Sequence, residues 1–163
     1  MKATTLLERQ HRSLRELCDT IEHGSVNVRL LLVAQLAGDL WAHLTIEKTL
    51  FYPKLDLAKA LQYPPLRDAR ADGPTRLACP PLNRVLETPA ADVAFEHRVM
   101  ELRTWLETHI AREETSVFPH AERALTADEL RALGTRMITL YAASNPYLFE
   151  SFEIANPRTV RPL

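Results

Sequence analysis

Apolar side chains recur every three or four positions along most of the chain, which is the spacing of amphipathic α-helices. The first such stretch spans about residues 4–23 and stops at Gly24, where we expect a glycine in the left-handed backbone region to end the helix. The second begins at an N-cap supplied by Ser25 or Asn27 and continues to Pro53, which ends or kinks it. The pattern therefore predicts two long consecutive helices.

The middle of the chain interrupts this pattern. Residues 54–88 contain six proline and glycine residues, so only short helical pieces fit there. The periodicity returns at Thr88 and Pro89, an N-cap followed by proline at the first helical position, and predicts a helix from there to about Phe118. A third bundle helix would therefore have to come from the interrupted segment.

Thr126 and Glu129 have the spacing of a capping box and predict a last helix that ends near Tyr141. The sequence thus predicts an all-α protein, an antiparallel up-and-down four-helix bundle with an irregular proline-rich third segment and an extra C-terminal helix. We assign residues 1–143 to this bundle and residues 144–163 to an extended tail that carries aromatic side chains. The tail is a candidate contact of a homodimer.

Composition and charge narrow the class of protein. The chain of 163 residues has the length of one domain, and its formal net charge of −1 gives no electrostatic footprint for nucleic acid or an anionic membrane. Cys18 and Cys79, the two cysteines, lack the spacing of a metal-binding pair. No apolar run is long enough to cross a membrane, and the first residues lack the pattern of a secretory signal. We therefore expect a cytoplasmic protein with free thiols.

A 14-residue segment occurs twice, at residues 40–53 and again at residues 106–119. Leu, His, Glu, Thr and Pro stand at the same places in both copies, and an aromatic residue precedes each final Pro. Each copy places a His and a Glu four residues apart, namely His43 with Glu47 and His109 with Glu113. Because four residues turn a helix by about 400°, the two side chains of each pair point to one face.

Both pairs lie within the apolar face of their predicted helices, where an imidazole and a carboxylate are unfavourable unless they are paired or bound to a metal. A third pair with the same spacing, His97 with Glu101, projects about 120° away from His109, so we expect it to be a surface ion pair. Taken alone, each pair of the repeat is explained by an intrahelical contact. The repeated flanking residues favour the interpretation that the two pairs share a cation.

His11 adds a fifth candidate ligand, because it shares the apolar side of the first helix with Leu7, Leu14 and Cys18. Antiparallel helices bring His11 and His43 to nearly one level, within about 5 Å, and His109 differs in depth from His43 by about one turn. The candidate metal ligands are therefore His11, His43, Glu47, His109 and Glu113. Three nitrogen and two carboxylate donors suit Fe, Mn or Zn. The role of His120, about two turns beyond Glu113, stays open.

These residues resemble the hemerythrin-like family, also called the HHE cation-binding domain. The matching motifs are Gln10-His11, His43 to Glu47 with Phe51-Tyr52-Pro53, and His109 to Glu114 with Phe118-Pro119. The similarity covers about residues 4–53 and 90–137. The resemblance implies a four-helix bundle with a non-haem di-iron site, often oxo- or hydroxo-bridged. It also implies roles in O2, NO or redox sensing, in iron handling, or in repair of iron centres.

One ligand of the family pattern is missing. The family places a His on its third helix, which would come from residues 54–88, and no His occurs there. Glu96-His97 imitates the local sequence of that ligand, but a single helix would place His97 about 18 Å from His109. A second metal ion would be absent, completed by water, or held by a different residue, with three candidates that nothing distinguishes: Asp56, Asp68 and Glu87.

The sequence therefore predicts a metal-binding protein, with iron as one ion or a bridged pair and with Mn or Zn as alternatives. Open positions on the metal would bind a small ligand such as O2 or NO, and no catalytic residue is assigned. Two other hypotheses stay open. One is a di-iron redox enzyme, and the other is a metal-free helical interaction module whose site is degenerate.

Overall fold

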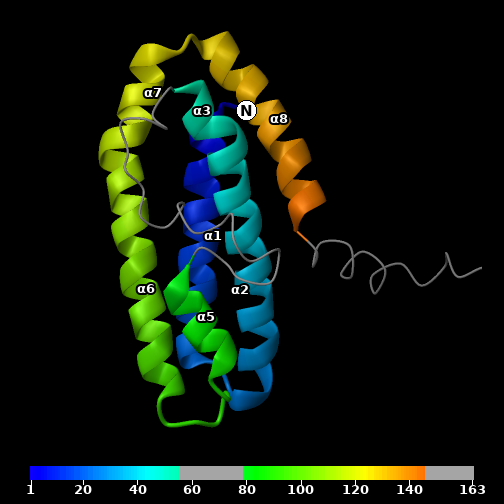
Figure 1. The fold of residues 1–163 in the computed structure, drawn as a ribbon, viewed down its shortest axis with the longest axis vertical. Helices are drawn as coiled ribbons and strands as arrows, with labels where there is room; N and C mark the ends of the chain where they lie inside the picture. The colour runs from blue at the N-terminus through cyan, green and yellow to red at the C-terminus, as the bar shows by residue number, and fades with distance from the viewer. Residues whose placement is uncertain (56–78, 146–163) are drawn as a thin grey trace, which may run out of the picture.

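The computed structural model describes residues 1–55 and 79–145, and all the regular secondary structure in these residues is helical (Figure 1). The long helices are α1 (Ala3–His23), α2 (Val26–Ile46), α6 (Phe95–Arg112) and α8 (Ala127–Ser144). The short ones are α3 (Tyr52–Lys54), α5 (Pro80–Glu87) and α7 (Phe118–Ala124). Two π-helical segments, η1 (Glu47–Phe51) and η4 (Glu113–Val117), join α2 to α3 and α6 to α7. The prediction of an all-helical protein is confirmed.

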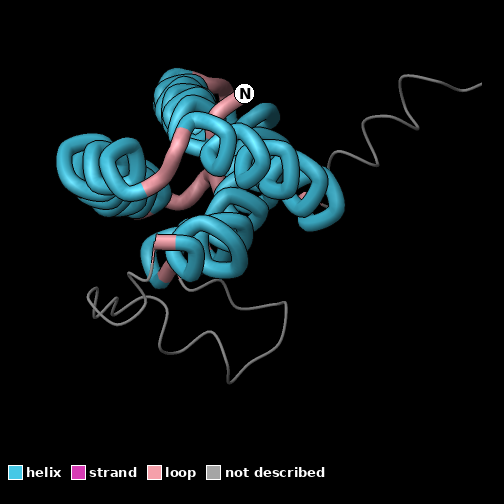
Figure 2. Tube along the Cα trace, turned by 90° about the horizontal axis from the view of Figure 1, so that it is seen from above, coloured by secondary structure: helices cyan, strands magenta, loops and turns pink. Residues whose placement is uncertain are grey.

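Helix α1 packs against both α2 and α6 and so connects them (Figure 1). Helices α1 and α2 run in opposite directions, and α6 runs parallel to α2. Helix α5 packs against α6 and α2 at the end of the molecule where α2 begins, whereas α8 packs against α2 and α1 at the other end. Figures 1 and 2 both place α6 and α8 on opposite sides of the α1–α2 pair. None of the described helices combines the length and the apolar composition that a membrane crossing requires.

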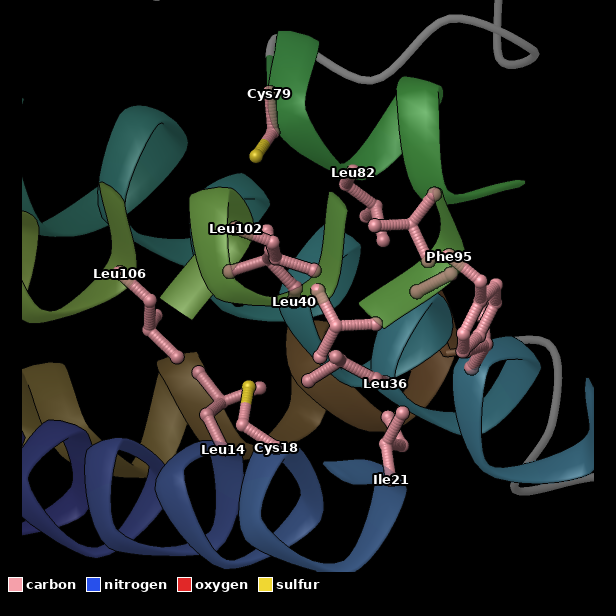
Figure 3. Close-up of a cluster of buried hydrophobic side chains, with 14 of the residues drawn as sticks. Leu14, Cys18, Ile21, Leu36, Leu40, Cys79, Leu82, Phe95, Leu102 and Leu106 are labelled. Atoms are coloured by element: carbon pink, nitrogen blue, oxygen red, sulfur yellow. The ribbon is translucent and has the colours of Figure 1, made fainter. Parts of the chain in front are cut away.

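The interior contains two apolar clusters. The first draws its side chains from α1, α2, α5 and α6, as Figure 3 shows, and includes Leu14, Leu36, Leu40, Leu82, Phe95, Leu102 and Leu106. The second lies where α8 packs and includes Leu7, Ile46, Phe51, Phe118, Leu130 and Met137. Along α1, Leu7 belongs to the second cluster and Leu14 to the first, so His11 lies between them. Cys18 and Cys79 are buried in the first cluster as free thiols, as expected.

The end of α1 and the start of α2 lie where predicted, but their local geometry differs from the prediction. Gly24 follows α1 as predicted, but its φ of −76° and ψ of 154° are extended rather than left-handed. The glycine is needed for a different reason, because a Cβ at this position would lie 2.8 Å from the carbonyl oxygen of Thr20. Ser25 is the residue that precedes α2, although its side chain makes no capping hydrogen bond.

The predicted start of the third long helix at Thr88 and Pro89 is wrong. The Thr88 hydroxyl donates a hydrogen bond backward to the carbonyl of Arg84, so Thr88 ends α5 instead of opening α6. Helix α6 begins only at Phe95, after a turn in which the Asp92 carboxylate accepts a hydrogen bond from the backbone of Ala94. The short helix α5 agrees with the prediction of broken helical pieces before residue 88, and residues 56–78 lie outside the described residues.

The capping box that opens the last helix is confirmed. The Thr126 hydroxyl accepts a hydrogen bond from the backbone N–H of Glu129, and the Glu129 carboxylate accepts one from the backbone N–H of Thr126. Helix α8 then continues to Ser144, three residues beyond the predicted end. The helix covers the second apolar cluster with Leu130, Leu133 and Met137.

Gly134 tests the packing of α8 on the start of the chain. A Cβ at Gly134 would contact the Met1 carbonyl oxygen and lie 3.0 Å from the backbone nitrogen of Ala3. Replacing a mid-helix glycine by alanine ordinarily stabilises a helix by about 1 kcal/mol. We expect the opposite for Gly134→Ala, a loss of about 1–3 kcal/mol, because two backbone segments would have to separate. Chemical denaturation measures this loss, with Thr135→Ala, at the exposed neighbour, as control. A more stable G134A protein would contradict the packing.

Candidate metal centre

Each copy of the repeated segment forms a π-helical turn that begins at its glutamate. The backbone N–H of Tyr52 bonds to the carbonyl of Glu47, and that of Phe118 bonds to the carbonyl of Glu113, five residues back in both cases. In both turns the residue that donates this hydrogen bond is followed by a proline, Pro53 or Pro119. A proline ring cannot donate a backbone hydrogen bond and collides with the carbonyl four residues earlier, and one wider turn relieves that collision. The helix therefore continues past the proline while its glutamate stays on the inner face.

The five predicted ligands come together in the interior, between the two apolar clusters. His11 is supplied by α1, the pair His43 and Glu47 by the end of α2 and the start of η1, and the pair His109 and Glu113 by the end of α6 and the start of η4. All five residues are at most 6% exposed. One donor atom from each lies within 4.8 Å of the donor atoms of the other four. The predicted convergence of three helices on one buried point is confirmed.

The cluster consists of two close His–Glu pairs and a third imidazole, that of His109, which lies between them. His43 Nε2 lies 2.8 Å from Glu47 Oε1, and His11 Nε2 lies 3.1 Å from Glu113 Oε2. His109 Nε2 lies 3.6 Å from both Glu47 Oε1 and Glu113 Oε2, midway between the pairs. The carboxylates thus face imidazoles from two different helices each, which is the arrangement that a shared cation needs.

The donor set fits a metal ion. Within the described residues, the buried atoms His43 Nε2 and Glu47 Oε1 have no partner with hydrogen-bond geometry, although they face each other. Buried polar atoms are normally satisfied, so an unsatisfied imidazole nitrogen beside an unsatisfied carboxylate oxygen is compatible with the binding of a cation. Imidazole nitrogen together with carboxylate oxygen suits Fe, Mn or Zn.

Burial and charge give the four residues of the repeat unequal proton affinities. Burial lowers the pKa of His43, and Glu47 offsets only part of that effect. Burial alone would raise the pKa of Glu47, but the nearby charges of His43 and His109 hold it well below its usual value. Burial opposes the charged form of His109, yet Glu47 and Glu113 raise its pKa to about 9. Burial and the charge of Glu47 raise the pKa of Glu113 to about 7. Metal binding would therefore release protons from His109 and Glu113.

Several side chains around the cluster were not assigned to the site from the sequence. Tyr52 is buried and its hydroxyl donates a hydrogen bond to Glu113 Oε1. Gln10 and Glu114 lie 2.9 Å from the Nδ1 atoms of His43 and His11, respectively. Trp105 stacks on His109 with ring centroids 5.6 Å apart. The sequence contained a signal for Tyr52. An aromatic residue precedes the proline in both copies of the repeat, but only the first copy has a tyrosine, whose hydroxyl can bond to the site, where the second has Phe118.

Other candidates lie away from the cluster. The side chain of His97 is 70% exposed and lies 3.5 Å from Glu101, which confirms the predicted surface pair. His120 and Glu87 are exposed and do not belong to the buried group. Glu87 is therefore wrong as a substitute for the missing third-helix ligand. Asp56 and Asp68 lie outside the described residues.

Comparison with known proteins assigns the family. The fold and the buried cluster define an all-helical protein whose His and Glu side chains are compatible with metal binding. The sequence profile of the hemerythrin HHE cation binding domain matches residues 2–121, so the chain belongs to that family. The crystal structure of a hemerythrin HHE cation binding domain-containing protein from Mycobacterium kansasii is similar, with a TM-score of 0.74 and 25% sequence identity over 98% of this chain and 93% of that chain. No curated protein matches the sequence.

The raised pKa values predict how pH acts on the metal-free protein. The pKa of His109, about 9, and that of Glu113, about 7, both lie above their usual values, so the folded protein holds more protons than the unfolded chain in this range. Stability from these groups is present at lower pH and is lost as pH rises through the folded pKa values. The lowered pKa of His43 acts in the opposite direction, but mainly below its ordinary value of 6.5.

We therefore expect the free energy of unfolding to fall between about pH 7 and pH 9, by up to about 1.4 kcal/mol per pH unit for one proton. Denaturant titrations of chelator-treated protein across this range measure the slope. His109→Gln should flatten it and His97→Ala, at an exposed site, should preserve it. A free energy that rises over the same range would show that the two groups do not hold these protons.

Proposed function

We propose that this protein binds a non-haem metal, with iron as the expected element, through His11, His43, Glu47, His109 and Glu113. The observation that carries the proposal is the convergence of their donor atoms within 4.8 Å in the interior, where all five side chains are buried. Membership in a cation-binding domain family supports the same role. Measurement of the metal content per chain will distinguish a single ion from a bridged pair.

The centre has room for a ligand that the protein does not supply. Five protein groups cannot fill the coordination of two six-coordinate ions, and they leave one position on a single ion. When bound, an iron centre with such open positions supplies affinity for O2, NO or peroxide. The residues of this chain orient the donors and exclude bulk water, with the Tyr52 hydroxyl holding one carboxylate oxygen of Glu113. We therefore propose that the protein binds or senses such a small ligand, or handles iron.

We further propose that the architecture is a four-helix bundle in which α5 takes the third position. Helix α5 supports this assignment, because it packs against α6 and α2 where a third helix would lie. Helix α8 would then be an addition to the bundle. The tail after residue 143 stays a candidate dimer contact.

Substitution of single ligands tests the proposal. His43→Ala and His109→Ala should each lose most of the iron that the wild-type protein carries when it is purified without added metal, because each removes an imidazole from the centre of the cluster. His97→Ala is the matched control, since it alters a His–Glu pair of the same spacing outside the cluster. Elemental analysis together with near-ultraviolet absorption measures the loss.

Three results would change this account. Equal iron loss in all three variants would contradict the assignment of the site. A wild-type protein without metal would favour the metal-free interaction module. Turnover of O2 or peroxide with a reductant would favour the redox enzyme over a binding or sensing protein.

A further inference from the structure

The buried imidazoles of His11 and His43 each contact, through Nδ1, a side chain that is not among the five candidate ligands. His11 Nδ1 lies 2.9 Å from Glu114 Oε1, and His43 Nδ1 lies 2.9 Å from Gln10 Oε1. Both partners present an oxygen acceptor, so each contact favours the form with the hydrogen on Nδ1, although His11 Nε2 also lies 3.1 Å from Glu113 Oε2. A neutral imidazole with its hydrogen on Nδ1 offers the lone pair of Nε2, and in both residues Nε2 is the atom that faces the cluster.

Gln10 and Glu114 each contact an imidazole that is carried by a different helical segment from their own. Gln10 precedes His11 on α1, so α1 directs one side chain into the cluster and the adjacent one to His43 on α2. Glu114 follows Glu113 in η4 and reaches back to His11 on α1. The corresponding residue in the first copy of the repeat is Lys48, which is exposed. The repeat is therefore broken at the position that supports His11.

The two supports differ in charge. Glu114 offers a carboxylate, and Arg15 lies 3.5 Å from the same oxygen that faces His11. Arg15 in turn donates hydrogen bonds of 2.9–3.0 Å to Glu107 near the surface, which fixes its guanidinium. Gln10 offers a neutral carboxamide instead. A carboxylate accepts a stronger hydrogen bond than an amide and makes the imidazole a better donor to a metal.

We propose that Glu114 and Gln10 are positioning residues that fix the Nδ1–H form of His11 and His43, and that Glu114 makes His11 the stronger metal donor of the two. The second part, the greater donor strength of His11, rests on the proposed metal-binding function. The first part concerns the hydrogen bonds of the protein itself.

Nuclear magnetic resonance of the 15N-labelled, metal-free protein tests the first part. We expect a slowly exchanging Nδ1–H resonance for His11 that disappears in Glu114→Ala and persists in Glu114→Gln, whose amide oxygen still accepts. Lys48→Ala, the matched position in the other copy, should leave the resonance unchanged. Gln10→Ala should remove the corresponding resonance of His43. A resonance that survives in Glu114→Ala, or a His11 hydrogen on Nε2 alone, would overturn the assignment.

Competition of Zn2+ with a chelator tests the second part. Because the hydrogen-bond partners of metal-bound histidines affect metal affinity by about 10- to 100-fold, we expect Glu114→Gln to weaken Zn2+ binding by about 10-fold and Glu114→Ala by up to about 100-fold. Gln10→Glu should strengthen binding, and Lys48→Ala should not change it. Thermal unfolding without metal verifies that the variants are folded.

Wild-type affinity in both Glu114 variants would overturn the second part of the proposal. A wild-type protein that fails to bind Zn2+ while its Nδ1–H resonances behave as expected would contradict the proposed function and the donor-strength claim, but it would leave the positioning role standing. The two experiments therefore distinguish failure of the positioning role from failure of the metal-binding function.

Discussion

The structure depends on the burial of three imidazoles and two carboxylates in an otherwise apolar interior. Such groups are strongly unfavourable there unless opposite charges or a cation compensate them. The cluster compensates itself only in part, since His109 stands between Glu47 and Glu113 at 3.6 Å from each, and burial with the charge of Glu47 raises the pKa of Glu113 to about 7. Apolar clusters on both sides keep water away and hold the helices that carry these groups. A bound cation would complete this compensation.

The same local structure, an α-helix followed by a π-helical turn, positions the His and the Glu in both copies of the repeat. In each copy, a His on an α-helix is followed by a Glu that opens a π-helical turn, and the wider turn allows the helix to continue past a proline. The copies then diverge where their surroundings differ, as Tyr52 bonds to Glu113 whereas Phe118 stacks on His11. Helix α8 lies beyond residues 2–121, which match the family, and it covers the apolar cluster beside the two π-helical segments.

The sequence was sufficient for what depends on helical periodicity alone. His11, His43, Glu47, His109 and Glu113 could be placed on inner faces, and His97 on an outer one, because the angle per residue is nearly constant along a helix. The start of α6 at Phe95 could not be predicted, since Thr88 has the features of an N-cap and only the structure shows its hydroxyl bonded backward to Arg84. The contacts of Gln10 and Glu114 also required coordinates, because they depend on how neighbouring helices are rotated about their axes. The family pattern would draw its third-helix His from residues 54–88, and residues 56–78 of that segment lie outside the described residues.

X-ray absorption spectroscopy of the metal-loaded protein tests the central claim most directly, because it detects the atoms bound to the metal. A centre built from the five residues predicts a first shell of nitrogen and oxygen only, with the outer-shell scattering of about three imidazole rings and no sulfur. A shell that contains sulfur from Cys18 or Cys79, or one without imidazole scattering, would contradict this account of the site.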